Sequence, residues 1–258
     1  MLNTNRLTKT VLILLITAGL SLGSTQAFSL TITNVNENFD DVTGLAVAGS
    51  VRSIADILTN DSGQLPAGTT WSAGNVANTN VRRADDRINT SVGASGFDSF
   101  FAPVNSTNNF LIIGDNTAAI ADLPNSGRMY MSFPFTLQES TSSVTISYDY
   151  AFDGRDTGTG TDTFAVLLTD FSNTLTIQFL QSPTFTSGTF SEIFPIITSQ
   201  PTPMALIFTL SEASSTNTNT AVGIDNILVT SIPEPATLLL LGSGLMGIGF
   251  AARKRFKK

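Results

Sequence analysis

Short runs of alternating apolar and polar residues fill the middle of the chain. Residues 144–152 alternate strictly, and residues 163–169 form a similar run rich in Leu, Val and Phe. Six further runs, bounded by Gly, Asn, Asp, Ser and Thr, lie at 29–35, 110–114, 128–137, 175–180, 204–210 and 223–230. Period-two alternation between turn residues is typical of half-buried antiparallel strands. The pattern predicts an all-β fold, an antiparallel β-sandwich without internal repeats.

One segment of this region has a helical pattern instead. Residues 51–58 place Val51, Ile54 and Leu58 on one face, which predicts one or two helical turns within a connection. Residues 60–109 mix Gly, Asn, Ser and Asp, and they predict long loops with two or three short strands.

The N-terminal end is apolar without alternation. Arg6 and Lys9 precede an apolar stretch at 11–22, and small residues follow up to Ala27. This order is typical of a secretory signal peptide. We expect a signal helix within residues 1–27 and cleavage after Ala27.

The C-terminal end combines an uncharged run at 236–252 with a basic cluster at 253–258. A charge at the bilayer centre costs about 2.5 to 3.5 kcal/mol on insertion scales, so such a cluster stops membrane transfer. The run has 17 residues, the lower end of the roughly 17 to 25 that span a bilayer. It predicts a C-terminal transmembrane helix, with the basic end in the cytoplasm.

Directly before this run stands the acidic tripeptide Pro233-Glu234-Pro235. The order of tripeptide, apolar helix and basic end resembles the PEP-CTERM sorting signal of Gram-negative bacteria. The resemblance covers residues 232–258. It implies recognition by an exosortase at the inner membrane, followed by transfer to the cell surface or to extracellular matrix and exopolysaccharide. A simple tail anchor is the alternative. The β-sandwich domain is then expected at 28–231.

Charge in residues 28–231 is strongly one-sided. Six arginines and no lysine stand against 19 acidic residues, a net charge of −13. A domain this acidic repels phosphate backbones, and we therefore expect no nucleic-acid partner. Acidic loops attract divalent cations, and calcium is the cofactor that we expect outside a cell.

The chain contains neither cysteine nor histidine. This excludes disulfides, thiol catalysis, Ser-His-Asp hydrolysis and His-ligated zinc. The remaining enzymatic route is a pair of carboxylates, as in glycoside hydrolases. No pair of acids stands in a motif with catalytic geometry, and we expect no enzyme.

A first candidate calcium site is the loop at 152–162, which contains Asp153, Asp156 and Asp162. Carboxylates close together, with glycines that let carbonyl groups turn inward, suit the six to eight oxygen ligands of calcium. The alternative is a solvated hairpin loop whose Asp and Gly serve turn geometry.

A second constellation joins the two ends of the domain. Glu37, Asp40 and Asp41 follow the first run, and Asp225 lies between apolar residues in the last. This arrangement resembles jelly-roll carbohydrate-binding modules and lectin-like sandwiches, whose terminal strands share a structural calcium. The resemblance implies a jelly-roll-like fold with Asp225 as a ligand and Glu37, Asp40 or Asp41 as its partner. The alternative is that Asp225 and Asn226 form a bulge or a hydrogen-bonded strand end.

Three aromatic residues are candidates for stacking on a sugar. Trp71 is the sole tryptophan, and Tyr148 and Tyr150 share one face of a strand. The alternative for Trp71 is a place in the core.

Three functions remain open. The first is a non-catalytic surface or matrix protein associated with exopolysaccharide or biofilm, the second a calcium-dependent glycan-binding module, and the third a two-carboxylate glycoside hydrolase.

Overall fold

The computed structural model of the chain describes residues 31–46, 50–72, 79–85, 95–102, 106–114, 128–154, 162–181, 184–211 and 220–234. The chain divides into two compact units, and the unit Thr31–Pro233 holds all the strands and helices described here. None of the described helices is long and apolar enough to cross a membrane. The expected signal helix and transmembrane helix lie outside the described residues.

Strands dominate this unit, as the alternation predicts. In chain order the described elements are β1 (Ile32–Glu37), β2 (Val51–Ser53), α2 (Ile54–Asn60), η2 (Ser62–Gln64), β3 (Thr70–Ser72), β4 (Thr79–Asp85), α3 (Ser95–Phe101), β5 (Thr107–Gly114), β6 (Arg128–Leu137), β7 (Thr141–Asp153), β8 (Thr163–Thr169), β9 (Thr174–Leu180), β10 (Phe185–Pro195), β11 (Thr202–Ser211) and β12 (Ala221–Pro233).

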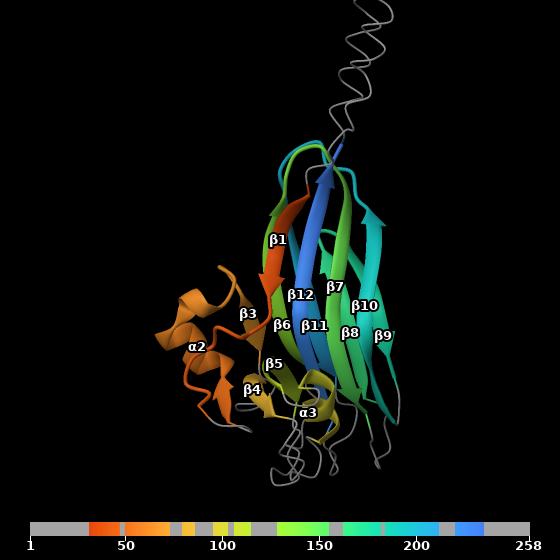
Figure 1. Cartoon of the computed structure of the whole chain (residues 1–258). Helices are drawn as coiled ribbons and strands as arrows, with labels where there is room; N and C mark the ends of the chain where they lie inside the picture. Colours follow the sequence, from red (N-terminus) through yellow and green to blue (C-terminus); the bar gives the residue numbers. More distant parts are fainter. Residues whose placement is uncertain are drawn as a thin grey trace, which may run out of the picture. The chain divides into compact units, whose positions relative to one another are not determined.

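These strands form two antiparallel sheets, and the long strands of both sheets run along a common direction (Figure 1). Sheet A has seven described strands in the order β10-β7-β12-β5-β4-β2, and β1 also pairs with β12. Sheet B has five in the order β3-β6-β11-β8-β9. The predicted all-β antiparallel class is confirmed, and the arrangement is consistent with a β-sandwich.

The main core lies between the two sheets. Alternate residues of β7, from Val144 to Phe152, are buried or partly buried against it, and sheet B supplies Phe133, Phe164 and Phe208. Apolar residues of β12 and β1 complete this cluster. Because the unit contains its own core and all its strand pairings, we expect it to fold without the two ends of the chain.

A second, smaller core lies on the outer face of sheet A. There α3 packs Phe97 and Phe101 against Phe110 of β5, and the rings of Phe101 and Phe110 stack with centroids 4.4 Å apart. Gly223 of β12 makes room for Phe101, because a Cβ atom at that position would lie 2.4 Å from its ring. The expectation of loops and short strands at 60–109 was therefore incomplete, since it contained no helix there.

Two other sequence-based expectations need correction. The helix expected at 51–58 begins at Ile54, because residues 51–53 form β2 and the Ser53 hydroxyl accepts a hydrogen bond from the backbone N–H of Asp56 at 3.2 Å. Strand β10 was not predicted at all. Its Ser, Gly and Thr residues give it the composition of a turn, although it pairs with β7 along its whole length.

The last strand runs directly into the tripeptide at the C-terminal end. Pro233 is still paired opposite Thr141, and the Ser142 hydroxyl donates to the carbonyl of Ile232 at 2.9 Å. A buried set of hydrogen bonds supports this end, since Thr198 donates to Gln138 and accepts from the N–H of Thr141. The fold thus extends to Pro233.

Gly114, where β5 pairs with the start of β12, is expected to tolerate no side chain. Its φ is +96°, and a Cβ atom would lie 2.4 Å from the backbone carbonyl oxygen of Thr220. We expect Gly114→Ala to lower the free energy of unfolding by about 2 kcal/mol or more, the scale of a strained backbone residue. Urea denaturation measures it. Gly63→Ala is the control, because nothing lies within 4 Å of its Cβ position. Equal stability of the two variants would contradict this prediction.

Candidate functional site

The candidate site lies where β12 changes its partner. Ala221–Ile224 of β12 pair with β5, whereas Ile227–Ser231 pair with β1, and β7 lines the other side throughout. Between these two stretches stand Asp225 and Asn226. The register against β7 shifts here, and Asn226 has a φ of +51°. A bulge at Asp225–Asn226, one of the two sequence-based alternatives, is confirmed, and Asn is among the residues that most readily adopt this conformation.

The segment that follows β1 is held at the bulge by hydrogen bonds to Glu37 and to β5. The backbone N–H of Phe39 donates to Glu37 Oε1 at 2.7 Å, and the Phe39 ring is fully buried in the main core. Asn109 of β5 donates from Nδ2 to the carbonyl of Phe39 at 3.1 Å and from its backbone to Asp40 Oδ1 at 3.4 Å. These bonds hold Glu37 and Asp40 at the junction of β1, β5 and β12.

Asp225 is the most buried carboxylate of this junction, with 1% of its surface exposed. Asn108 Nδ2 donates to its Oδ2 at 2.5 Å, and the backbone N–H of Asn226 donates to its Oδ1 at 2.7 Å. Burial raises the pKa of Asp225 to about 7, and the negative charges of Asp40 and Asp149 raise it further against those two hydrogen bonds. Its charged form is poorly stabilised.

Glu37 is also a buried carboxylate with a raised pKa. It is 6% exposed, and burial raises its pKa to about 7, with Asp41 and Asp40 as like-charged neighbours. Asp40 therefore acts electrostatically on both Glu37 and Asp225, so the structure brings the predicted set Glu37, Asp40, Asp41 and Asp225 to one junction.

A fifth acidic side chain, which the sequence did not indicate, joins them from β7. Asp149 lies opposite Asp225 in the register and accepts hydrogen bonds from Asn226 Nδ2 at 2.8 Å and from the Thr189 hydroxyl. The signal for Asp149, Asn108 and Asn109 is the pairing register, which local sequence patterns do not reveal.

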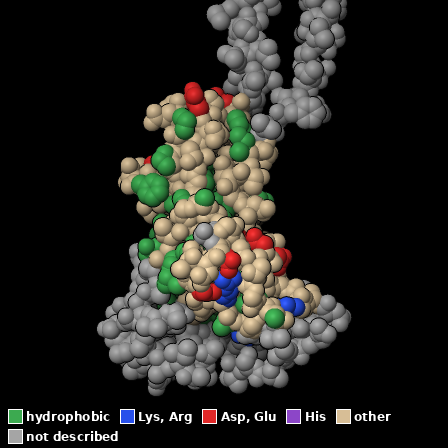
Figure 2. Space-filling model, turned by 90° about the vertical axis from the view of Figure 1, so that its left-hand side faces the viewer, with side chains coloured by type: hydrophobic (Ala, Val, Ile, Leu, Met, Phe, Trp, Pro, Cys, Tyr) green, Lys and Arg blue, Asp and Glu red, His purple; other side chains and the backbone are tan. Residues whose placement is uncertain are grey.

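No cation is among the groups that shift the pKa of Glu37 or Asp225. Arg52 bonds to Asp56 and Asp61, Arg82 forms an ion pair with Asp98, and the Arg83 guanidinium donates to main-chain carbonyls. On the face that carries α2, the few basic side chains lie near acidic ones (Figure 2). Among the described residues, no group of three or more acidic side chains is placed so that it could hold a metal ion.

The loop at 152–162 lies elsewhere. Asp153 pairs opposite Ala221, four residues before Asp225 and so about 13 Å away along β12. Asp153 and Asp162 are each 3% exposed, and the Thr220 hydroxyl donates to Asp162. Asp156 is outside the described residues. The structure does not bring Asp153 and Asp162 together with Asp225.

The predicted aromatic residues do not form an exposed platform. Tyr148 is 1% exposed, its ring stacks on Phe190 at 4.9 Å, and its hydroxyl donates to Gln178 Oε1 at 2.7 Å. Tyr150 shares its face, as expected, but this face points into the sandwich. Trp71 is half-buried and packs against the main core, its alternative place. The expectation for Tyr148 therefore needs correction, because a ring in the core cannot stack on a sugar.

The outer face of sheet B carries two further aromatic residues, Tyr130 and Phe179. The register places Tyr130, Thr209, Ala165 and Phe179 in one row across β6, β11, β8 and β9. Tyr130 and Ala165 are half-buried, Phe179 is 57% exposed, and Thr209 is only 2% exposed. Only the register brings these aromatic residues into one row.

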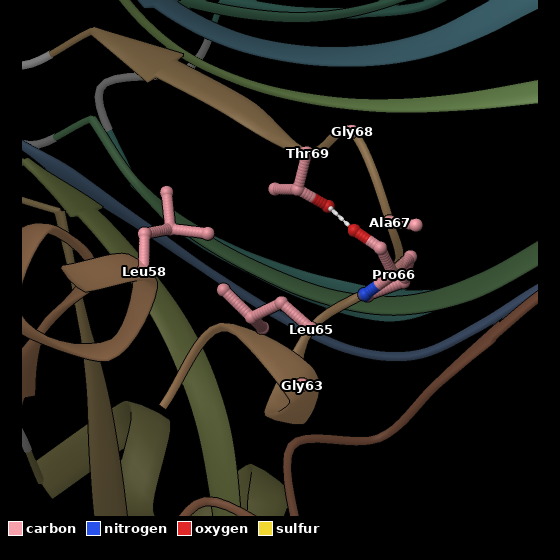
Figure 3. Close-up of a pocket in the computed structure, with 7 residues that line it drawn as sticks. All are labelled: Leu58, Gly63, Leu65, Pro66, Ala67, Gly68 and Thr69. Carbon is pink, nitrogen blue, oxygen red and sulfur yellow. Dashed lines mark hydrogen bonds between the residues drawn. The ribbon is translucent and has the colours of Figure 1, made fainter. Parts of the chain in front are cut away.

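An open hollow of about 530 Å³ lies beside α2 (Figure 3). It is lined by Leu58, Gly63, Leu65, Pro66, Ala67, Gly68 and Thr69. The Thr69 hydroxyl donates to the carbonyl of Pro66 at 2.6 Å and is thus engaged within the loop. None of the described residues that line this hollow is charged.

Residues 231–255 match the PEP-CTERM protein-sorting motif, which confirms the resemblance seen at the C-terminal end. The motif implies an exported protein that is anchored in a membrane through this signal and processed by an exosortase. No curated protein matches the chain as a whole.

Several solved structures are similar to the chain at low identity. TmCBM61, solved in complex with β-1,4-galactotriose, is 12% identical with a TM-score of 0.36, over 65% of this chain and 90% of that one. The Stig cyclase Fisc from Fischerella sp. TAU is 12% identical with a TM-score of 0.43, over 79% and 99%. The arabinose-bound MgGH51 α-L-arabinofuranosidase is 10% identical with a TM-score of 0.41, over 81% and 27%. They include both binding modules and enzymes, so they do not decide between these classes.

Proposed function

We propose that this protein is a non-catalytic component of the cell surface or extracellular matrix, delivered by an exosortase and associated with exopolysaccharide. Its sandwich is a jelly-roll-like domain that binds calcium at the junction of β1, β5 and β12. The observation that supports the ion is the pair of buried carboxylates, Glu37 and Asp225, which have raised pKa values and no cation beside them in the part of the chain that the structure describes.

A divalent ion would offset the cost of burying these two carboxylates in their ionised form. Burying an ionised carboxylate without a positive partner is costly, and calcium prefers oxygen ligands from carboxylates, amide carbonyls and the main chain. Asp225, Asp40 and Glu37 are the residues that would hold it. When bound, the ion would supply the positive charge that lets β1 meet β12 with Glu37 and Asp225 ionised.

The same burial argues against a glycoside hydrolase. A raised carboxyl pKa is typical of a catalytic acid, but a sugar must reach both carboxylates of the pair. Glu37 and Asp225 are 6% and 1% exposed, and backbone N–H groups bind both of them. They therefore suit a structural ion better than a substrate.

Calcium binding is testable by calorimetric titration of the domain comprising residues 28–234. We expect binding with a dissociation constant of about 0.1 to 1 mM, the range of extracellular calcium modules. Asp225→Asn should abolish it. Glu139→Gln is the matched control, because it removes an exposed acid from a turn without touching the junction. Binding that survives Asp225→Asn unchanged would place the ion elsewhere.

The glycan-binding alternative is favoured by one observation, the row of Tyr130 and Phe179 with small residues between them, since aromatic faces stack on sugar rings. Retention of the domain on immobilised exopolysaccharide, with calcium or with chelator, tests both roles. Retention that is lost in Phe179→Ala would identify this face as the binding surface. Retention that needs calcium and Asp225 would assign it to the ion site, and no retention in either condition would contradict the association with exopolysaccharide.

A further inference from the structure

One long side of the sandwich consists of two edge strands. Strand β10 ends sheet A and pairs only with β7 among the described strands, and β9 ends sheet B and pairs only with β8. Both lie on the right-hand side of Figure 1, and the hydroxyl of Tyr148 on β7 reaches Gln178 of β9. A free edge presents unpaired N–H and C=O groups to another strand.

This side carries almost no charge. Not one of the 21 residues from Phe171 to Ser191 is charged, and Glu192 is the sole charged residue on either strand. Proteins usually protect free edges with lysines or other charges. In a region with a net charge of −13, this is the side along which two copies can approach with the least repulsion.

Apolar side chains are concentrated on the same side. Seven large hydrophobic side chains are exposed in the described part of the chain, and five of them lie between residues 171 and 197. They are Phe171, Leu175, Phe179, Ile193 and Ile197. Exposed apolar residues gathered in this way are typical of a contact surface.

Of the two edge strands, β10 is better suited to pair with a strand of another molecule. The register of β9 against β8 shifts between Thr176 and Gln178, and such a bulge bends the edge away from a partner. Strand β10 pairs with β7 over 11 consecutive residues without a shift. Its Ser187, Ser191 and Ile193 side chains are exposed.

We propose that β10 of a second copy of this chain pairs antiparallel with the free edge of β10. This pairing joins the two seven-stranded sheets into one continuous sheet. An antiparallel strand that pairs with itself has two-fold symmetry, so one sequence supplies both halves of the interface. Main-chain hydrogen bonds give such an interface its affinity. This proposal does not rest on the calcium site or on glycan binding, although Phe179 of the candidate glycan-binding row lies on the same side.

Sedimentation equilibrium of residues 28–234 should show a monomer–dimer equilibrium. We expect it between about 10 μM and about 1 mM protein, because an interface made of one strand edge is small and associates weakly. We expect Ile193→Lys to weaken the dimer by at least tenfold. This residue is 67% exposed, so the fold has room for the change. Val51→Lys, at a 56% exposed position of edge strand β2, is the matched control and should dimerise as the wild type does.

Hydrogen exchange separates strand pairing from contact between side chains alone. Amides within 185–195 should exchange more slowly as the protein concentration rises, and this protection should vanish in Ile193→Lys. Ser191→Lys serves in its place if that variant misfolds. A wild-type domain that stays monomeric to about 1 mM would overturn the proposal and leave the edge to a strand of another protein. A dimer without protection at 185–195 would overturn it equally.

Discussion

The calcium-free domain is expected to lose stability as the pH rises from about 4 to about 7. Glu37 and Asp225 have pKa values raised from 4.5 and 3.8 to about 7 in the folded protein. Their contribution is fully present below the pKa values of the unfolded chain, where both states are protonated. It is lost as the pH passes through the folded values, because only the unfolded chain ionises them freely.

The expected loss is large for a single side chain. Each pKa unit corresponds to about 1.4 kcal/mol, so the whole titration of Asp225 sets an upper bound of roughly 4 kcal/mol. We expect at least about 2 kcal/mol between pH 5 and pH 8, since relaxation around a buried group reduces such shifts. Urea denaturation in chelator, at several pH values and constant ionic strength, measures it.

The variant Asp225→Asn isolates this effect from general repulsion among the acids. It should reduce the pH dependence to the part that Glu37 causes, whereas Glu139→Gln should leave it as in the wild type. Calcium at neutral pH should restore the lost stability in the wild type and in Glu139→Gln but not in Asp225→Asn, because a ligand that binds only the folded state stabilises it. A wild-type domain whose stability rises from pH 5 to pH 8 in chelator would contradict the burial of unpaired carboxylates.

The variant Phe208→Ala is expected to lower the free energy of unfolding by about 3 to 5 kcal/mol, the usual cost of truncating a buried phenylalanine. Phe208 is fully buried, and its ring lies edge-on to Tyr148 at 5.0 Å and to Phe133 at 6.0 Å. The change would leave a cavity between the two sheets. Denaturation at low protein concentration measures the loss.

Phe179→Ala is the matched control, because the same atoms are removed from a side chain that is 57% exposed. It should cost less than about 1 kcal/mol, as surface changes usually do. Similar losses in the two variants would mean that the space between the sheets does not hold the main core.

Alternation was a sufficient guide for strands with one buried face. The ranges 128–137 and 163–169 coincide with β6 and β8, and the remaining predicted runs lie within or across described strands. Strand β10 escaped prediction because, as an edge strand, it buries little of either face. The helix α3 escaped prediction because its phenylalanines pack on the outer face of sheet A, and the sequence pattern does not reveal that a second core lies there.

For the candidate site, residue type was predictable and pairing register was not. An isolated Asp in an apolar strand and the acids after the first strand indicated Asp225, Glu37, Asp40 and Asp41. Asp149 and Asn108 lie within ordinary strands, and only the register sets them beside Asp225. Alternation also placed Tyr148 and Tyr150 on one face but could not say that this face points inward.

Little chain separates the last strand from the uncharged run of the sorting motif. Pro233 is still held in the sheet, and the uncharged run begins at Ala236. The chain between them spans three Cα steps. At most about 11 Å of chain therefore joins Pro233 to the start of the uncharged run. A cut beyond Pro233 would leave the last strand complete.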